Sequence, residues 1–164
     1  MPLFSVDGPV GRRVQRIAGS RRFAPVAKHV IPRIDKGLHR LTNGRFVLSS
    51  LLVPSLVLTT TGAKSGQLRT TPLACMPEDD GAWVVVGSNF GQTKHPAWTA
   101  NLLAHPDATV NFRGREVRVR ARLLDGEERA ATWARIVQVW PTYDRYIELS
   151  GGRDIRVFRL EPIG

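Results

Sequence analysis

The strongest constraint on the fold of this chain is a series of short β-forming segments joined by turns too short for crossover helices. Residues 55–61 are rich in β-formers and stop at Gly62, and a second β-forming run, residues 69–76, follows the turn Lys64-Ser65-Gly66-Gln67. A further turn, Asp79-Asp80-Gly81, precedes a short strand over residues 83–86. Antiparallel strands accept such connections, whereas parallel strands need long crossovers. The pattern predicts an antiparallel sheet, with Pro72 marking an edge or a bulge.

The second half of the chain continues this pattern. Residues 108–112 predict a strand, Arg113-Gly114-Arg115 a hairpin turn, and residues 116–124 a strand that alternates apolar and charged side chains. In that strand, alternation directs inward Val117, Val119, Ala121 and Leu123. A last strand covers residues 155–160. The order favours a mainly β, α+β domain whose antiparallel strands close into a small barrel.

Helical signals interrupt the strands. Pro96 opens a short helix through residue 103, and Asp125 begins a longer one with Glu127 and Glu128 in its first turn. The inner face of this longer helix carries Trp133, Ile136, Val137 and Trp140. Pro141 ends it, and Tyr143 and Tyr146 follow on a short helical turn. Residues 87–95 read as a polar loop.

Charge divides the chain into a basic amphipathic segment, residues 1–44, and a nearly balanced domain, residues 45–164. The formal net charge is +10, and residues 1–46 hold ten basic and two acidic side chains. Apolar residues at helical spacing between residues 25 and 41 predict a helix that Pro32 interrupts. Two alternatives are open for this segment: contact with an anionic membrane surface through residues 9–45, or packing on the domain with solvated charges. No aromatic and basic platform accompanies the charge, so no nucleic acid is expected as a partner.

The sequence lacks the usual motifs for covalent and metal-dependent catalysis. There is no HExxH or Cys/His cluster, no serine-hydrolase elbow and no GxGxxG, so no metal is predicted and a bound cofactor would have to carry any reaction. Lys64, Ser65 and Arg69 lie around one turn, and two cations, a hydroxyl and turn amides suit a phosphate. The alternative for this turn is an ordinary polar hairpin. The single cysteine, Cys75, is compatible with a reducing cytoplasm, and no spanning helix or signal peptide is expected.

Residues 56–73, LVLTTTGAKSGQLRTTPL, resemble the deazaflavin-dependent nitroreductase family. The similarity continues at Gly87-Ser88-Asn89-Phe90-Gly91, at Pro96-Ala97-Trp98, and at Trp140-Pro141-Thr142-Tyr143-Asp144-Arg145-Tyr146, and it covers about residues 40–162. Ala74, Asn89 and Trp140 depart from the family pattern on the substrate side. The resemblance implies a split β-barrel related to FMN-binding oxidases.

The resemblance also implies a cofactor, coenzyme F-420, which is an 8-hydroxy-5-deazaflavin with a phosphate and an oligoglutamate tail. The implied coenzyme contacts on the turn and the returning strand are Ala63, Lys64, Ser65, Arg69, Thr70, Thr71, Pro72, Leu73 and Ala74. The remaining implied contacts are Val86, Gly87, Ser88, Asn89, Ala97, Trp98, Asn101 and Tyr143. Tyr143, Ser88 and Tyr146 would face the substrate as catalytic groups. Trp98 and Tyr146 have the alternative role of core packing.

The function that follows is an oxidoreductase that transfers hydride from reduced F-420 to a small-molecule acceptor, such as a quinone, an enone or a nitroaromatic compound. Two alternatives stay open: a split-barrel oxidoreductase that binds FMN or haem, and a non-catalytic carrier of F-420. The expected location is the cytoplasm, with the inner face of the membrane as the site of any peripheral contact.

Overall fold

The computed structural model describes residues 53–164. The basic segment over residues 1–44, its predicted helix and the predicted membrane contact through residues 9–45 lie outside the described residues. The strands are β1 (Ser55–Thr61), β2 (Leu68–Pro77), β3 (Trp83–Val86), β4 (Asp107–Phe112), β5 (Arg115–Leu123) and β6 (Val157–Pro162). The helices are η2 (Asn89–Gly91), a 3-10 turn, and α3 (Ala97–Ala104), α4 (Gly126–Val139) and α5 (Thr142–Leu149).

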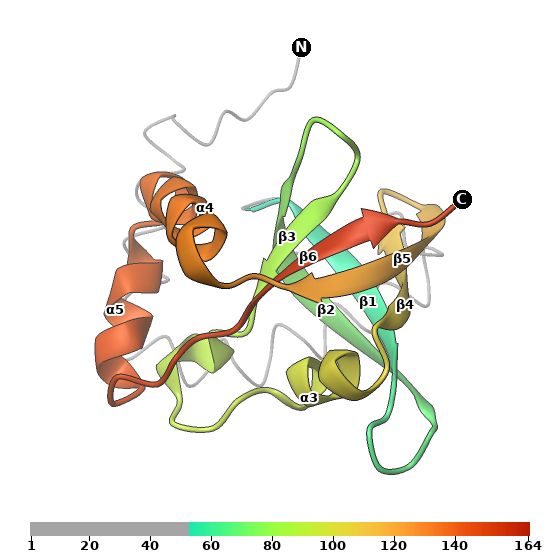
Figure 1. Cartoon of the computed structure of the whole chain (residues 1–164), viewed down its shortest axis with the longest axis horizontal. Helices are drawn as coiled ribbons and strands as arrows, with labels where there is room; N and C mark the ends of the chain where they lie inside the picture. The colour runs from blue at the N-terminus through green and yellow to red at the C-terminus, as the bar shows by residue number, and fades with distance from the viewer. Residues whose placement is uncertain (1–52) are drawn as a thin grey trace.

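The six strands form a closed antiparallel barrel in the order β1-β2-β3-β6-β5-β4 (Figure 1). The predicted α+β barrel is therefore confirmed. A two-residue hairpin turn joins β4 to β5. Arg113 and Gly114 both have the positive φ that such a turn requires, 52° and 81°.

The first part of β2 has a paired neighbour on one side only, and this free edge explains Pro72. Over residues 68–74, β2 pairs only with β1, because β3 pairs with Cys75, Met76 and Pro77 alone. A proline cannot donate to a neighbouring strand, so an unpaired edge is where it is tolerated. The predicted edge position is confirmed.

The buried apolar residues form two clusters, one inside the barrel and one between the barrel and α4. The interior cluster contains Leu56, Leu58, Val85, Phe158 and Leu160, and α3 closes one end of it with Trp98 and Leu102. The second cluster lies on the outer face, where the side chains that β3 and β6 direct outward meet α4; its buried members are Val84, Leu124, Ile136, Trp140 and Val157. Figure 1 accordingly shows α4 and α5 together on one side of the barrel.

The end of β5 and the helix after it differ from the sequence prediction in detail. Leu123, predicted inward, is 40% exposed, and the next residue, Leu124, is buried instead. The prediction is wrong there because the strand leaves the barrel at this point and Leu124 joins the cluster under α4. Asp125 occupies the N-cap position of α4, although its side chain makes no capping hydrogen bond.

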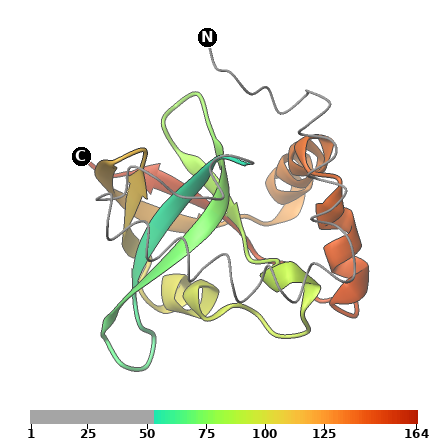
Figure 2. The ribbon, with the colours of Figure 1, turned by 180° about the vertical axis from the view of Figure 1, so that it is seen from behind.

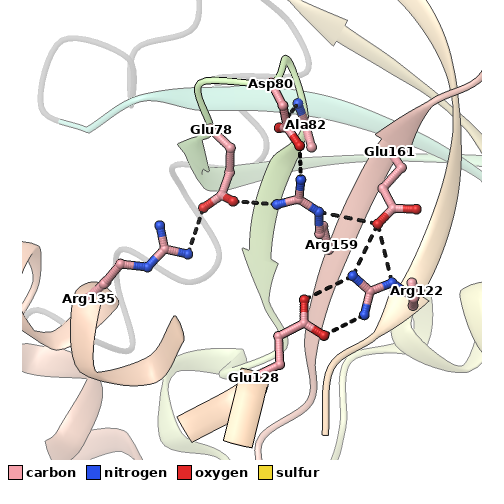
Figure 3. Close-up of polar contacts among 8 residues, drawn as sticks. All are labelled: Glu78, Asp80, Ala82, Arg122, Glu128, Arg135, Arg159 and Glu161. Carbon is pink, nitrogen blue, oxygen red and sulfur yellow. Dashed lines mark hydrogen bonds and ion pairs between the residues drawn. The ribbon is translucent and has the colours of Figure 1, made fainter. Parts of the chain in front are cut away.

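A network of charged side chains ties α4 to the outside of the barrel (Figure 3). Arg159 on β6 contacts Glu78, Asp80 and Glu161 with a side chain only 15% exposed. The network continues through Arg122 to Glu128 on α4 and through Glu78 to Arg135 on α4, at 2.6 and 2.8 Å. Single exposed ion pairs contribute little, but a connected set with bidentate arginines holds geometry better. The network therefore helps to hold α4 against β5 and β6.

None of the helices within residues 53–164 is long and apolar enough to span a bilayer.

Candidate functional site

The turn between β1 and β2 is internally closed but leaves donors free. Gly62 N–H donates to the Gln67 carbonyl at 2.8 Å, and Gly66 N–H donates to the Gly62 carbonyl at 2.9 Å. Glycine suits position 62 because a Cβ there would crowd the turn, at 2.5 Å from the Ser65 hydroxyl oxygen and 3.1 Å from the Gln67 carbonyl oxygen. The backbone amides of Lys64 and Ser65 have no partner among residues 53–164. Adjacent free amides in a turn form an anion-binding concavity.

Two cations flank these amides. Lys64 and Arg69 are exposed. Within the described part of the chain, Lys64 makes no ion pair, and the Arg69 guanidinium makes one hydrogen bond, to the Gln67 side chain at 3.2 Å. The Ser65 hydroxyl accepts from Gln67 N–H at 3.3 Å, which leaves its proton free to donate. This arrangement can bind a phosphate through charge-assisted hydrogen bonds.

The turn borders a groove of about 480 Å³ between the start of β2 and α3. Figure 2 shows the β1–β2 hairpin extending beside α3 at this end of the barrel. The groove brings together many of the predicted coenzyme contacts: Ala63, Lys64, Ser65, Arg69, Thr70, Thr71, Ala97, Trp98 and Asn101. Gly62 and Ala100 also line it and were not predicted. Helical periodicity offered a signal for Ala100, since it shares one face of α3 with Ala97 and Asn101.

Asn101 holds the turn in place. Its Oδ1 accepts from Ala63 N–H at 2.9 Å, and its Nδ2 donates to the Thr60 hydroxyl at 3.0 Å. The side chain is buried, at 8% exposure, so both amide atoms are used within the protein. We conclude that Asn101 positions the turn, and that the Ala63 amide is directed toward α3.

Replacing Asn101 with alanine is expected to lower the free energy of unfolding by about 1–3 kcal/mol, because Ala63 N–H and Thr60 would lose their partner in a partly buried place. Urea denaturation measures this change. The matched control is Asn111→Ala on β4, since the Asn111 Oδ1 has no hydrogen-bond partner in the described part of the chain. Equal losses in both variants would contradict the role given to Asn101.

The other predicted coenzyme contacts lie beyond the groove lining. Pro72, Leu73 and Ala74 continue β2 along its open edge, and the run Val86, Gly87, Ser88 and Asn89 follows the end of β3. The Asn89 side-chain amide donates to the Lys94 carbonyl at 2.9 Å and to the Gln92 side chain at 3.3 Å. Tyr143 lies on α5.

Tyr143 and Tyr146 belong to an aromatic cluster formed by α4, α5 and η2. Their ring centroids are 5.6 Å apart in a T-shaped arrangement. Tyr143 also lies 6.0 Å from Trp140 and 6.2 Å from Trp133, and Tyr146 lies 6.4 Å from Phe90. Edge-to-face contacts of this kind fix ring orientation. The sequence prediction did not include Phe90.

Burial keeps the hydroxyls of this cluster protonated. The pKa of Tyr143 is raised by burial, then by Tyr146 and by Cys75, and burial also raises the pKa of Tyr146. Both phenols are therefore hydrogen-bond donors at neutral pH. Burial raises the pKa of the Cys75 thiol to about 12, so this side chain is not a thiolate nucleophile.

Ser88 is buried and takes the N-cap position of η2 without a capping hydrogen bond from its side chain. Over residues 53–164, no group of three His, Cys, Asp or Glu side chains is placed to hold a metal ion.

A family model and individual relatives of known sequence point to the same protein family. Residues 31–162 match the model of the F420H(2)-dependent quinone reductase family. An F420H(2)-dependent quinone reductase of Mycobacterium tuberculosis is 35% identical over 108 residues, which are 65% of this chain and 70% of that protein. A second Mycobacterium tuberculosis protein, named a putative reductase of the same kind, is 33% identical over 92 residues, which are 56% of this chain and 76% of that protein.

Solved structures agree. A structure described as an F420-H2 dependent reductase has a TM-score of 0.59 and 38% identity, covering 66% of this chain and 94% of that one. Another, described as a domain-swapped dimer, has a TM-score of 0.62 and 33% identity, covering 78% of this chain and 96% of that one.

Proposed function

The chain belongs to the family of F420H(2)-dependent quinone reductases, and on this premise we propose that it is an oxidoreductase that uses reduced coenzyme F-420 to reduce a quinone. The observation that carries the proposal is the β1–β2 turn, where two free amides, Lys64 and Arg69 converge beside the groove. The family match favours F-420 over the alternative cofactor FMN.

The residues present fit a phosphate-bearing coenzyme. Lys64 supplies a point charge and Arg69 a planar fork, while the amides of Lys64 and Ser65 supply neutral donors. Ala97 and Ala100 carry small side chains on the face of α3 that lines the groove, which leaves room between this helix and β2. Residues 72–74 continue from the groove along the unpaired edge of β2 and would hold the ring system.

When bound in its reduced form, F-420 supplies a hydride, so the protein needs no nucleophile or metal of its own. The protein's part is orientation and electrostatics. Lys64, Ser65 and Arg69 would anchor the coenzyme, and the edge of β2 would hold its ring system. Tyr143 keeps its phenolic proton and donates a hydrogen bond to the acceptor oxygen on which negative charge grows. Ser88 is the second candidate donor. The aromatic cluster around Tyr143 offers ring faces that suit a planar, apolar acceptor.

Replacing Tyr143 with phenylalanine is expected to lower kcat for a quinone about 10- to 100-fold, because one donor to a developing oxyanion is lost while the packing is kept. The change is measured from the loss of reduced F-420 with menadione, and the affinity for F-420 provides a second readout. Trp133→Phe, which alters a neighbouring ring in the same cluster, is the control. An unchanged kcat in Tyr143→Phe, with a reduced kcat in Ser88→Ala, would transfer the role to Ser88.

A panel of acceptors tests the substrate class. Menadione is expected to be reduced faster than a nitroimidazole or a cyclohexenone at equal concentration, with F-420 as the donor. Binding of F-420 without oxidation by any quinone would favour the alternative of a non-catalytic carrier.

A further inference from the structure

The loop after β3 contains three consecutive residues in the left-handed region. The φ angles are 47° at Asn89, 53° at Phe90 and 73° at Gly91. Glycine adopts this conformation freely, but a bulky aromatic residue is an outlier there. Such strain persists only where the surroundings impose it, and it is often found at functional sites.

Arg153 provides the surroundings that hold this loop. Its guanidinium donates to the carbonyls of Ser88, Gln92 and Gly87 at 2.8, 3.1 and 3.2 Å. These acceptors lie on both sides of the strained residues. A fourth contact, of 2.7 Å, joins Arg153 to the Nδ1 of His95. A guanidinium carries five N–H donors in a fixed planar fork, whereas a lysine ammonium carries three, so an arginine can satisfy these four acceptors at once and a lysine cannot.

The strained conformation places the loop directly on α5. A Cβ at Gly91 would lie 2.8 Å from the Leu149 Cβ and 3.3 Å from the Tyr146 Cα. The Phe90 ring meets Tyr146 at 76°, yet Phe90 remains 39% exposed. The strain is therefore not offset by burial of the ring in the core. The strained conformation instead leaves the Phe90 ring partly exposed beside Tyr146, and Tyr146 in turn contacts Tyr143.

We propose that Phe90 is a specificity-determining residue that completes, with Tyr143 and Tyr146, the wall that recognises a planar acceptor, and that Arg153 is the positioning residue that holds Phe90 there. This inference rests on the proposed function, because the acceptor is the quinone named above.

Arg153 forms a clamp on the loop through its hydrogen bonds to the three carbonyls and its contact with His95. The contact with His95 makes this clamp sensitive to acid. Arg153 has only donors, so Nδ1 must accept, and His95 must be neutral with its proton on Nε2. Burial, Arg156 and Arg153 lower the pKa of His95, while Asp154 opposes them. At neutral pH the acceptor is present. In acid, His95 becomes protonated, so Nδ1 no longer accepts a hydrogen bond and the imidazolium repels Arg153.

Because the pKa of His95 is lowered in the folded protein, acid decreases the free energy of unfolding. An unfolded His95 titrates near pH 6.5, above its folded pKa. As the pH falls below 6.5, the unfolded state gains a proton first, so the free energy of unfolding decreases until the pH reaches the folded pKa of His95. The variant His95→Asn keeps an acceptor oxygen and cannot titrate in this range. We expect menadione binding by the wild-type chain to weaken as the pH falls below 6.5, and we expect this variant to remove that acid dependence.

The first test uses Phe90 and menadione as the probe. Phe90→Ala is expected to weaken menadione binding about tenfold, the loss expected for one aromatic contact, with F-420 affinity changed less than about threefold. Phe90→Gly is expected to weaken menadione binding equally and to raise Tm, because glycine relieves the positive φ. The matched control is Leu123→Ala, another exposed apolar residue, on β5. Menadione affinity within twofold of wild type in both Phe90 variants would overturn the proposal.

The second test uses Arg153. Arg153→Gln is expected to speed hydrogen exchange at the amides of Gly91 and Gln92 and to weaken menadione binding about tenfold, as the loss of Phe90 does. Arg129→Gln is the matched control, since Arg129 also donates to a backbone carbonyl, that of Ile155, but outside this loop. If Arg153→Gln does not fold, Arg153→Lys keeps the charge, loses the fork and should show the same exchange.

The outcomes separate this inference from the proposed function. Wild-type chain that binds no F-420 refutes the proposed function, whatever the Phe90 variants do. Wild-type chain that binds F-420 and reduces menadione, together with normal exchange and menadione affinity in both Arg153 variants, refutes only the role of Arg153.

Discussion

Replacing Lys64 and Arg69 together by alanine is expected to weaken F-420 binding about a hundredfold or more, because each side chain contributes about 1–3 kcal/mol through a charge-assisted hydrogen bond. The single variants should each lose part of this affinity. The free energy of unfolding should change little, since the Arg69 side chain makes one hydrogen bond, to Gln67, and Lys64 makes no ion pair within residues 53–164. Fluorescence titration with F-420 at two salt concentrations measures the effect.

The matched control for this double variant is Arg115→Ala with Arg118→Ala, which removes two exposed arginines from β5. The register of β1 with β4 and of β4 with β5 places Arg115 at the opposite end of the barrel from the β1–β2 turn. Net charge falls equally in both double variants, so any difference is local. Unchanged affinity in Lys64→Ala and in Arg69→Ala would remove the assignment of the turn.

Replacing Trp98 with alanine is expected to lower the free energy of unfolding by about 3–5 kcal/mol, the cost of a large buried aromatic residue. Trp98 is 5% exposed and its ring lies 5.8 Å from that of Phe158 inside the barrel. Chemical denaturation measures the loss, and Trp98→Phe, which keeps an aromatic ring in the cavity, should lose less. A near-normal stability with a large loss of F-420 affinity would make Trp98 a coenzyme contact rather than core.

Much of the barrel could be predicted because local patterns and final contacts agree. The alternation in residues 116–121 follows the pleat of β5, and Arg113-Gly114 adopts the hairpin geometry that its glycine favours. The prediction failed at Leu123, where the apolar and charged alternation continues in the sequence although the strand has left the barrel. There the position of α4, which no pattern within the strand encodes, decides that Leu124 is the buried residue.

From residue types and spacing alone, the candidate site was predictable only where its parts are close in sequence. Lys64, Ser65 and Arg69 lie around one turn, so they suited an anion site, with a polar hairpin as the alternative, whereas the contacts on α3 came from the family resemblance. Arg153 could not be found this way, because it reaches the carbonyls of Gly87 and Ser88 from across the fold. The strain at Phe90 is likewise a backbone property without a sequence signal, and Asn101 was predicted to contact the coenzyme although its amide holds the turn.

The most direct test of the account is a titration of the full chain with F-420 and with the same deazaflavin lacking its phosphate and tail, repeated on the Lys64→Ala, Arg69→Ala double variant. We expect the wild-type chain to bind F-420 about a hundredfold tighter than the phosphate-free compound, and the double variant to bind both with similar affinity. Equal binding of both ligands by the wild-type chain, or a full preference for F-420 in the variant, would contradict it.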